Sequence, residues 1–240
     1  MLSRRGEPLF LAAWQRVLML HLELEADSLQ RHVPFPLDLH HGRAFVSLVA
    51  FSMEGMRPRL GGAATARLFQ PIATHDFLNV RTYVIQNGEP GIHFMAEWLN
   101  SRLAVTLGPT TFGLPYRHGT LAYNLHPGHE PLRGQVTDTK THDQLAFSAG
   151  LPEPSAFRPA ENGSLTEWLM ERYTAFNAAG GRRRYFRVWH PPWPQQAASA
   201  NIEDRTLLAR RWPCFAEARL IGANYSPGFD EVWMGRPHRC

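Results

Sequence analysis

A strand-like segment near the middle of the chain carries an arginine among polar and aromatic residues. In FLNVRTYV, residues 77–84, the side chains of an extended strand alternate between two faces. One face suits an ordinary core: Leu78, Val80, Thr82 and Val84. The other face is aromatic, polar and cationic: Phe77, Asn79, Arg81 and Tyr83. If this second face points into a cleft, Arg81 needs an anionic partner, and its planar guanidinium matches a carboxylate. If it points outward, Arg81 is an ordinary surface charge.

The next extended segment, residues 92–99, offers partners for that arginine. His93, Met95 and Glu97 alternate along it, so His93 or Glu97 would lie opposite Arg81. A structural ion pair is the simpler interpretation. The alternative is a ligand site, to which Asn79, Tyr83, Phe77, Glu97 and Trp98 would contribute binding contacts.

The segment TTFGLPYRHG, residues 110–119, ends in a phenol, a guanidinium and an imidazole. It is either a polar turn or part of the wall of a site. In a site, Arg81 or Arg117 would polarise a carbonyl or carboxylate of the substrate. Tyr116, His21 or His93 would then carry protons, as such groups do in general acid–base catalysis.

Several kinds of site are disfavoured by the motifs. The twelve histidines come closest to metal-ligand spacing at residues 40–41 and 126–130, but neither place has the i, i+4 pair of a zinc protease. The chain has no G-x-S-x-G elbow, P-loop or dinucleotide fingerprint. We therefore expect no metal and no other cofactor.

The charge pattern favours a small molecule over nucleic acid as the partner. The net charge is +4, and Lys140 is the single lysine among 25 basic residues, a bias that a GC-rich genome explains. The one basic cluster, residues 180–189, is typical of a turn followed by a strand. A small-molecule ligand is expected, and self-association into a homo-oligomer stays open.

Neither a membrane segment nor a disulfide framework is indicated. No apolar run reaches the roughly 18–20 residues of a membrane span. Charged and bulky residues interrupt the apolar N-terminal stretch, and no signal-peptide cleavage site follows it. Cys214 and Cys240 lie far apart, which fits a reducing compartment. We therefore expect a cytoplasmic protein.

Short extended runs separated by Gly and Pro predict a sheet-rich fold. Strands are expected at 43–51, 79–85, 92–99, 102–108, 111–116, 120–130, 133–139, 143–150, 216–225 and 229–235. Segment 43–51 is apolar on both faces, which predicts a central, covered strand. Helices are expected at 26–33 and, with a Ser164–Glu167 capping box, at 163–177. Residues 191–204 are expected to connect into a weakly helical stretch. The pattern indicates one α+β domain, residues 1–240, dominated by a folded-over antiparallel sheet.

The motifs taken in order resemble the YqjF-like family of bacterial proteins. The resemblance runs from about residue 8 to 235, through LMLHLELEADSLQRHVPFPLDL, FVSLVAFSMEGMRPR, LNVRTYVIQNGEPGIHFM, FGLPYRHG, GSLTEWLMERY and VWHPPWP. That family is grouped with acetoacetate decarboxylase. The grouping implies a large antiparallel β-sheet curled into a closed, barrel-like cone with an internal cavity and few peripheral helices.

Two departures from that pattern affect the expected chemistry. Acetoacetate decarboxylases place a lysine pair after a Gly-aromatic-Pro motif and form a Schiff base there, whereas this chain has Tyr116 and Arg117. A guanidinium cannot form an imine, and Lys140 lies in a polar stretch. Relatives usually carry a glutamate where this chain has Phe77, and Asp76 should point to the opposite face unless the strand bulges.

The resemblance and the departures together imply chemistry without an amine. The expected function is an enzyme that acts on a hydrophobic substrate bearing a carbonyl or carboxylate, by cyclisation, dehydration or isomerisation in secondary metabolism. A non-catalytic binding protein for a hydrophobic organic acid is the alternative. A purely structural role, with the polar face of 77–84 paired internally, is the third.

Overall fold

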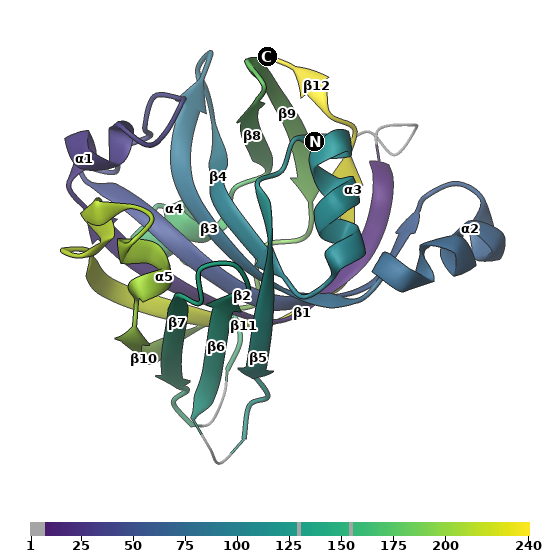
Figure 1. Ribbon diagram of the computed structural model, residues 1–240. Helices are drawn as coiled ribbons and strands as arrows, with labels where there is room; N and C mark the ends of the chain where they lie inside the picture. Colours follow the sequence, from purple (N-terminus) through teal and green to yellow (C-terminus); the bar gives the residue numbers. More distant parts are fainter. Residues whose placement is uncertain (1–7, 129–130, 154–155) are drawn as a thin grey trace.

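The computed structural model describes residues 8–128, 131–153 and 156–240 (Figure 1). Strands account for 55% of the residues and helices for 16%, so the expectation of a sheet-rich protein with few helices is confirmed. The end of the strand expected at 120–130 lies outside the described residues. No helix in these ranges is both long enough and apolar enough to cross a membrane.

The strands of the described residues form a single twelve-stranded sheet. In spatial order they are β12 (His238–Arg239), β9 (Arg182–Trp189), β8 (Thr174–Ala179), β4 (Glu89–Leu99), β3 (His75–Gln86), β2 (Ala44–Pro58), β1 (Pro8–Leu24), β11 (Arg219–Gly235), β10 (Gln196–Asp204), β7 (Gln144–Gly150), β6 (Leu132–Asp138) and β5 (Tyr116–Asn124). Neighbours run antiparallel except in the β4–β8 pair, which is parallel. Asn87 and Gly88 join β3 to β4 with φ of 52° and 78°, as a two-residue hairpin turn requires.

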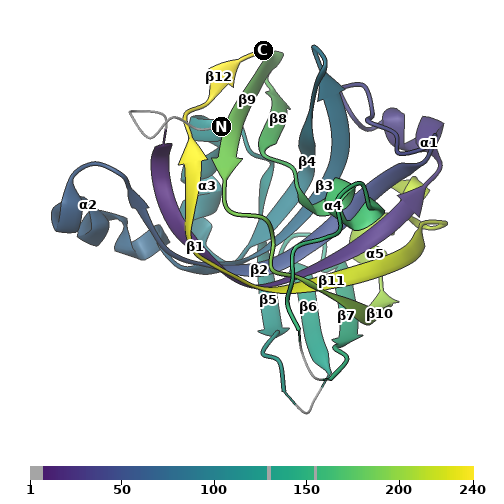
Figure 2. The same cartoon turned by 180° about the vertical axis from the view of Figure 1, so that it is seen from behind.

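Two further pairings close the sheet on itself twice. Parallel pairing of β4 with β5 closes a ring of nine strands, β4-β3-β2-β1-β11-β10-β7-β6-β5. Pairing of β9 with β11 closes a second ring of seven, β9-β8-β4-β3-β2-β1-β11. The two rings share the long strands β1, β2, β3, β4 and β11, which cross the molecule in Figures 1 and 2. Each face of these shared strands therefore looks into a different ring.

The nine-stranded ring holds the main apolar core. Leu20, Leu48 and Val80 face it from the shared strands, and Val136 and Phe147 face it from β6 and β7. The opposite face of the shared strands lines the seven-stranded ring. The division of 77–84 into an apolar face and a polar, aromatic face is thus confirmed. The expectation that 43–51 is a covered, central strand is also confirmed, because β2 lies between β1 and β3 and is buried throughout 44–53.

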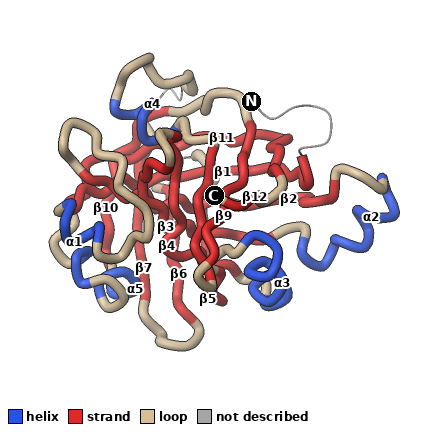
Figure 3. Tube along the Cα trace, turned by 90° about the horizontal axis from the view of Figure 1, so that it is seen from above, coloured by secondary structure: helices blue, strands red, loops and turns tan. Residues whose placement is uncertain are grey.

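Short helices lie around the edges of the sheet. They are α1 (Ala26–Gln30), α2 (Gly62–Phe69), η1 (Gln70–Ile72), α3 (Arg102–Phe112), α4 (Leu165–Met170), α5 (Thr206–Ala209) and η2 (Pro213–Phe215). Helix α2 projects from the body at the opposite end from α1 and α5 (Figures 1 and 3). The helix expected at 26–33 is confirmed in its first half as α1.

The prediction of strands at 102–108 and 111–116 is wrong. Helix α3 occupies this region, and β5 begins only at Tyr116. Ser101 acts as the N-cap, because its Oγ accepts a hydrogen bond from the Ala104 amide at 3.2 Å. The Ser101 carbonyl also accepts the Val105 amide at 3.0 Å. Ser101 is thus a local signal for the start of a helix. The apolar residues that follow it suggested a strand instead.

Two other expectations fail because tertiary pairing overrides local preference. The Ser164–Glu167 cap forms as expected, but the helix ends at Met170 instead of 177. Residues 174–179 form β8, because Ala175 and Phe176 pair with β4 and the same strand pairs along its length with β9. The weakly helical stretch expected within 191–204 is instead β10, which bridges β7 and β11.

Candidate functional site

The polar face of β3 borders a small cavity inside the seven-stranded ring, which we call the inner pocket. Its volume is about 40 Å³. Six of the seven strands and the segments flanking β8 and β9 contribute its walls: Trp14, Val17, Met19, Val49, Phe51, Asn79, Arg81, Ile92, Phe94, Arg172, Tyr173, Thr174, Ala175, Val188, His190 and Trp193. This wall contains two arginines and no carboxylate.

Arg81 is held inside the ring by a backbone carbonyl and not by an acid. Its side chain is 7% exposed. One terminal nitrogen donates to the Leu169 carbonyl at 3.1 Å and lies 3.6 Å from the Met19 sulfur. Among the described residues Arg81 forms no ion pair, and its Nε has no hydrogen-bond partner. The prediction that Arg81 forms a structural ion pair with Glu97 or His93 is therefore wrong.

Arg172 brings a second guanidinium to the inner pocket from the turn after α4. Its Nη1 pairs with Asp38 at 2.7 Å and its Nε donates to the Trp168 carbonyl at 2.8 Å. Its guanidinium carbon lies 4.2 Å from the Trp168 ring centre. Its other terminal nitrogen is buried without a partner. Arg81 and Arg172 thus both bond carbonyls at the C-terminal end of α4, where a helix leaves acceptors free.

Unpaired donors are concentrated on the side chains that line the inner pocket. Four buried N–H groups there have no partner: those of Arg81 Nε, Arg172 Nη2, Trp14 Nε1 and Trp193 Nε1. The Asn79 side-chain oxygen is also unpaired. Buried polar groups are nearly always hydrogen-bonded, and leaving one unpaired costs about 1–3 kcal/mol. The side chains around this one cavity therefore carry four buried N–H donors whose hydrogen bonds are not made among the described residues.

His190 supplies a neutral imidazole to the same wall. Its Nδ1 lies 2.6 Å from the Pro191 carbonyl, which can only accept, so Nδ1 carries the proton and Nε2 keeps its lone pair. Burial lowers the pKa of His190 to about 4, and the charge of Arg81 contributes a smaller part. Rings of Trp14, Tyr173, Trp193 and Phe229 surround it. The ring is therefore fixed in orientation and uncharged near neutral pH.

A wider cavity of about 460 Å³ adjoins the inner pocket, and we call it the outer cavity. Tyr173, Val188 and His190 line both spaces, and Arg187, Trp189, Pro191 and Pro192 complete the outer one. Pro191 and Pro192 are exposed, so this cavity lies at the surface. The sequence motif VWHPPWP thus builds the junction between surface and interior. None of its residues was predicted as a site residue from the sequence, because they lie outside any regular helix or strand periodicity.

Tyr83 and His21 lie behind Arg81 in a buried hydrogen-bonded chain. Tyr83 Oη contacts the Leu169 carbonyl at 2.8 Å and Ser47 Oγ at 2.5 Å. Ser47 Oγ lies 2.7 Å from His21 Nδ1, and His21 Nε2 lies 3.1 Å from Asn224 Oδ1. Burial, with a smaller effect of Arg81, lowers the pKa of His21 to about 3. Neither side chain lines the inner pocket, so both are placed to position the Leu169 carbonyl and, through it, Arg81.

Phe77 and Tyr116 lie beyond the inner pocket. The Phe77 ring stacks on Phe51 at 5.2 Å with an interplanar angle of 8°. On the far side is an apolar cavity of about 280 Å³, which we call the side groove. It is lined by Phe10, Met53, Met56, Phe69, Ile72, His75, Ala104, Leu107, Gly108, Phe112, Tyr116 and Met234. The stretch FGLPYRHG therefore does border a cavity, but not the one that contains Arg81.

Glu97 lies between Asn79 on β3 and Tyr116 on β5, its cross-strand neighbours. It is 3% exposed, and its Oε2 has no partner. Burial without a nearby cation raises the pKa of Glu97 well above its usual range. Burial also raises the pKa of Tyr116, with Glu97 as a smaller cause.

A β-bulge separates His93 from Arg81. The pairing of β3 with β4 shifts at Met95, so Arg81 lies opposite Phe94 and Thr82 lies opposite His93. His93 Nδ1 donates to the Phe176 carbonyl at 2.9 Å, and its ring packs on Phe35. The expectation that His93 faces Arg81 is wrong, because alternation along β4 breaks at this extra residue.

Trp98 and Arg117 lie on the opposite side of the shared strands. Trp98 belongs to the core of the nine-stranded ring and donates from Nε1 to Asp138 at 2.9 Å. The Arg117 guanidinium carbon lies 5.9 Å from the Trp98 ring centre. Neither residue lines the inner pocket or the side groove. The structure therefore does not bring Arg117 or Trp98 together with Arg81.

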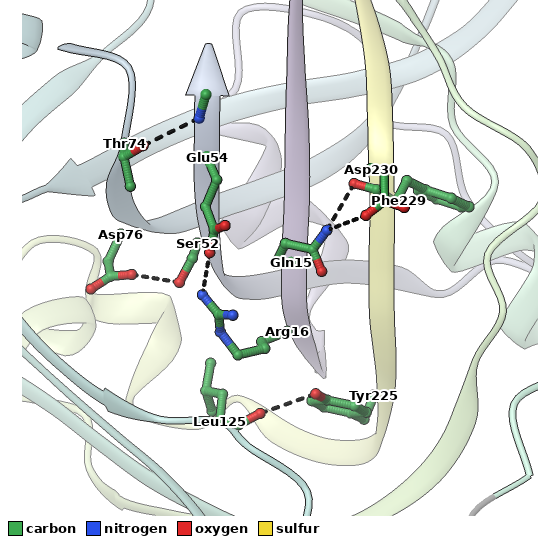
Figure 4. Close-up of polar contacts among 11 residues, drawn as sticks. Gln15, Arg16, Ser52, Glu54, Thr74, Asp76, Leu125, Tyr225, Phe229 and Asp230 are labelled. Carbon is green, nitrogen blue, oxygen red and sulfur yellow. Dashed lines mark hydrogen bonds and ion pairs between the residues drawn. The ribbon is translucent and has the colours of Figure 1, made fainter. Parts of the chain in front are cut away.

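Asp76 does not replace the missing acid at position 77. Pairing of β3 with β2 is regular from His75 to Thr82, so Asp76 points away from the side chain of Phe77. Asp76 Oδ1 accepts the Ser52 hydroxyl at 2.6 Å, outside the inner pocket (Figure 4). In the described ranges no group of three or more His, Cys, Asp or Glu side chains is arranged to hold a metal ion.

Solved structures share this fold at low sequence identity. An acetoacetate decarboxylase-like enzyme from Sphingomonas wittichii RW1 is 18% identical, with a TM-score of 0.64 over 98% of this chain and 94% of its own. Acetoacetate decarboxylase from Legionella pneumophila is 11% identical, with a TM-score of 0.68 over 100% and 92% of the two chains. The enduracididine biosynthesis enzyme MppR is 12% identical, with a TM-score of 0.67 over 98% and 88%. The fold is therefore acetoacetate decarboxylase-like.

Sequence comparison identifies the family. The uncharacterized protein YqjF of Bacillus subtilis is 32% identical over 197 residues, which make up 81% of this chain and 78% of that protein. The model of the DUF2071 family, described as an uncharacterized conserved protein, matches residues 11–229. The YqjF-like resemblance of the motifs is thus confirmed, and the chain belongs to the DUF2071 family.

Proposed function

We propose that the protein is a small-molecule enzyme that binds a hydrophobic organic acid in the seven-stranded ring and moves a proton at a carbon next to a carbonyl group. Cyclisation, dehydration or isomerisation in secondary metabolism would each begin with such a step. The observation that carries the proposal is the set of four unpaired N–H donors around a pocket wall that contains no acid. A carboxylate or enolate accepts several hydrogen bonds, so it would satisfy these donors together.

The sizes of the two cavities suggest how such a ligand lies. About 40 Å³ accommodates a group of the size of a carboxylate but not a whole substrate. The outer cavity of about 460 Å³, with Val188, Trp189 and two prolines in its wall, would hold the apolar remainder. The ring then acts as the barrel-like cone that the family resemblance implies, with the inner pocket as its cavity.

His190 is the residue placed to accept the proton. Its Nε2 lone pair is free, and its Nδ1–H is fixed on Pro191. A base of pKa about 4 is weak at neutral pH, but a bound anion would raise that pKa toward neutrality. The proton would pass from the substrate carbon to Nε2, and the guanidinium of Arg81 would stabilise the negative charge left on the enolate oxygen. MppR, which shares the fold, is described in a complex with pyruvate.

An imine mechanism is not supported by the position of the lysine. Lys140 lies exposed in the turn after β6, where nothing desolvates its amine. A guanidinium that stabilises an enolate directly would replace the iminium as the electron sink.

Binding of acids is tested first, with 4-methyl-2-oxopentanoate and the matched neutral ketone 4-methyl-2-pentanone. Arg81→Met should weaken binding of the acid by about 2–5 kcal/mol, roughly 30-fold to 5,000-fold. It should weaken binding of the ketone far less, because a neutral carbonyl oxygen gains much less from a guanidinium than a carboxylate does. Tyr83→Phe is the matched control, because it removes the other donor to the Leu169 carbonyl but does not remove a group of the inner pocket. If both variants lose acid binding equally, Arg81 acts only by holding α4, and the proposal fails.

Catalysis is distinguished from binding by isotope exchange. In D2O the protein should speed loss of the C3 protons of 4-methyl-2-oxopentanoate, followed by proton NMR, and His190→Gln should abolish that exchange. Binding without exchange in the unmodified protein would favour the alternative, a non-catalytic binding protein for a hydrophobic acid. The unpaired donors support that alternative as well, so the exchange rate decides between the two functions.

A further inference from the structure

The side groove differs from the inner pocket in the character of its wall. Most of its lining is apolar, with Phe10 from β1, Met53 and Met56 from β2, and Ala104 and Phe112 from α3. None of its lining residues is Asp, Glu, Lys or Arg. A charged group placed there would lose its hydration without gaining a partner. The wall therefore selects an uncharged ligand.

His75 provides the groove with an unsatisfied polar atom. Its side chain is 6% exposed, lines the groove, and has an Nδ1 that is buried without a partner. Burial lowers the pKa of His75 to about 4 against a smaller opposing contact with the Thr74 backbone, so the ring is neutral at neutral pH. A buried nitrogen of this kind calls for one hydrogen bond from a ligand. A hydroxyl suits either tautomer, because it can both donate and accept.

Tyr116 completes the polar part of the wall. Its ring packs against α3 at Gly108, where a Cβ atom would lie 2.1 Å from the ring. No hydrogen bond is formed by its hydroxyl among the described residues, although burial raises the pKa of Tyr116 and keeps it a neutral phenol. Two neutral hydrogen-bonding side chains, both in contact with the Phe77 ring, thus line an otherwise apolar space.

The stacked pair Phe51–Phe77 separates the groove from the inner pocket. Phe51 lines the inner pocket, while the Phe77 ring lies 4.8 Å from the His75 ring and 5.9 Å from the Tyr116 ring. A glutamate at position 77 would put a carboxylate between the two spaces. With phenylalanine, two stacked rings form this part of the wall, and the buried Glu97 carboxyl beside it, between Asn79 and Tyr116, is kept neutral by burial. No charged group therefore links the two cavities.

We propose that the side groove is a second binding site, for an uncharged hydrophobic molecule that carries a hydroxyl or carbonyl group. The volume of about 280 Å³ holds on the order of nine water-sized groups. A medium-chain alcohol fits this size, with its oxygen on His75 and its chain along Met53, Met56 and Ala104. This site is independent of the acid site proposed for Arg81.

The test compares 1-octanol with octanoate by calorimetric titration of the intact protein. The unmodified chain should bind 1-octanol saturably. Ala104→Phe fills the groove and should weaken 1-octanol binding at least about tenfold. His75→Phe keeps a ring but removes the nitrogen, and it should weaken 1-octanol binding about threefold to tenfold. Arg81→Met should leave 1-octanol binding within about twofold of the original. Ile72→Trp at the groove rim replaces Ala104→Phe if the latter does not fold.

The outcomes separate the two sites. Absence of saturable 1-octanol binding overturns the groove proposal, as does octanol binding that depends on Arg81 or ignores a folded groove-filling variant. Octanoate binding that is lost in Arg81→Met and kept in Ala104→Phe would support the acid site at the same time. Failure of octanoate to bind, with octanol bound in the groove, would remove the proposed function and leave this inference standing.

Discussion

At the scale of single residues, Glu97 shows what burial without a partner does to a carboxyl group. It has no cation nearby, so burial raises its pKa well above the usual value of 4.5. Above about pH 5 the unfolded chain loses this proton while the folded protein keeps it, so the free energy of unfolding falls as pH rises. The buried carboxyl is thus a neutral acid between the inner pocket and the side groove.

Glu97→Gln tests that assignment, because glutamine keeps the shape of a neutral carboxyl and cannot ionise. Relative to the unmodified protein, the variant should gain about 1.4 kcal/mol of stability for each pH unit above about 5, until the folded protein releases its proton. Urea unfolding at pH 5, 6 and 7 measures this difference. Parallel curves for the two proteins would mean that Glu97 is ionised in the folded state and paired with a cation.

Arg81 and His190 show which site residues a sequence can reveal. Arg81 lies on a regular strand, so the alternation of FLNVRTYV predicted its face, and the structure places it beside the inner pocket. His190 lies between β9 and a pair of prolines, where no periodicity assigns a direction. His93 was misplaced because one extra residue at Met95 reverses the alternation of β4. Whether these residues act on a substrate stays a prediction.

At the scale of elements, α4 is held by the two arginines that line the inner pocket and by Tyr83 behind them. Arg81 and Tyr83 bond the Leu169 carbonyl, and Arg172 bonds the Trp168 carbonyl. The helix has six residues, too few to be stable alone, so these contacts and the Ser164 cap define it. The capping box predicted where it begins. Its end was not predicted, because it depends on the pairing of β8 with strands distant in sequence.

The close approach of β1 and β11 depends on Gly228. This residue has φ of 104°, and a Cβ atom there would lie 1.9 Å from the Trp14 carbonyl oxygen. Gly228→Ala should therefore destabilise the protein by about 3 kcal/mol or more, since both strain and collision oppose it. Gly42→Ala is the matched control, because φ there is 75° but a Cβ would meet nothing within 4 Å. That change should cost only about 1–2 kcal/mol.

Chemical unfolding of the two alanine variants measures the difference. Equal losses for Gly228→Ala and Gly42→Ala would show that backbone strain alone accounts for the effect and that β1 can move away from β11. A larger loss at Gly228 would show that these strands, and the position of Trp14 beside the inner pocket, are fixed by backbone contact.

At the scale of the whole molecule, closure of the sheet was only partly predictable. Local sequence patterns located β2, β3, β4, β6, β7 and β9, and located β11 as two separate strands instead of one. The family resemblance implied a curled sheet. The pairing of β9 with β11 involves two residues on each strand, and that of β4 with β5 involves three. Such short pairings between segments distant in sequence cannot be predicted from local sequence patterns. They divide the sheet into two rings and separate the main apolar core from the ring interior that contains Arg81 and His190.

Burial of neutral histidines inside the seven-stranded ring and beside the side groove predicts sensitivity to acid. The pKa of His21 is lowered to about 3, and those of His75 and His190 to about 4. Below pH 6.5, the usual pKa of histidine, the unfolded chain binds these protons and the folded protein does not, so stability falls as pH falls. Glu97 opposes the trend by one proton, which leaves about two near pH 5, or about 3 kcal/mol per pH unit, and less near pH 6.5, where the unfolded histidines are half protonated. The lowered pKa of His93 acts in the same direction.

Measurement of the free energy of unfolding at intervals from pH 7 to pH 4.5 tests this prediction. In Glu97→Gln, where the opposing proton is absent, the free energy of unfolding should change more steeply, by about 4 kcal/mol per pH unit near pH 5. Adding His21→Gln to that variant should return the slope toward that of the unmodified protein. Carboxylates with lowered pKa values, such as Glu23 at about 2, stay ionised in the folded state across this range and ionised in most of the unfolded ensemble. A flat profile between pH 6.5 and 5 would therefore show that the buried histidines take up protons without unfolding, and that the ring interior admits water.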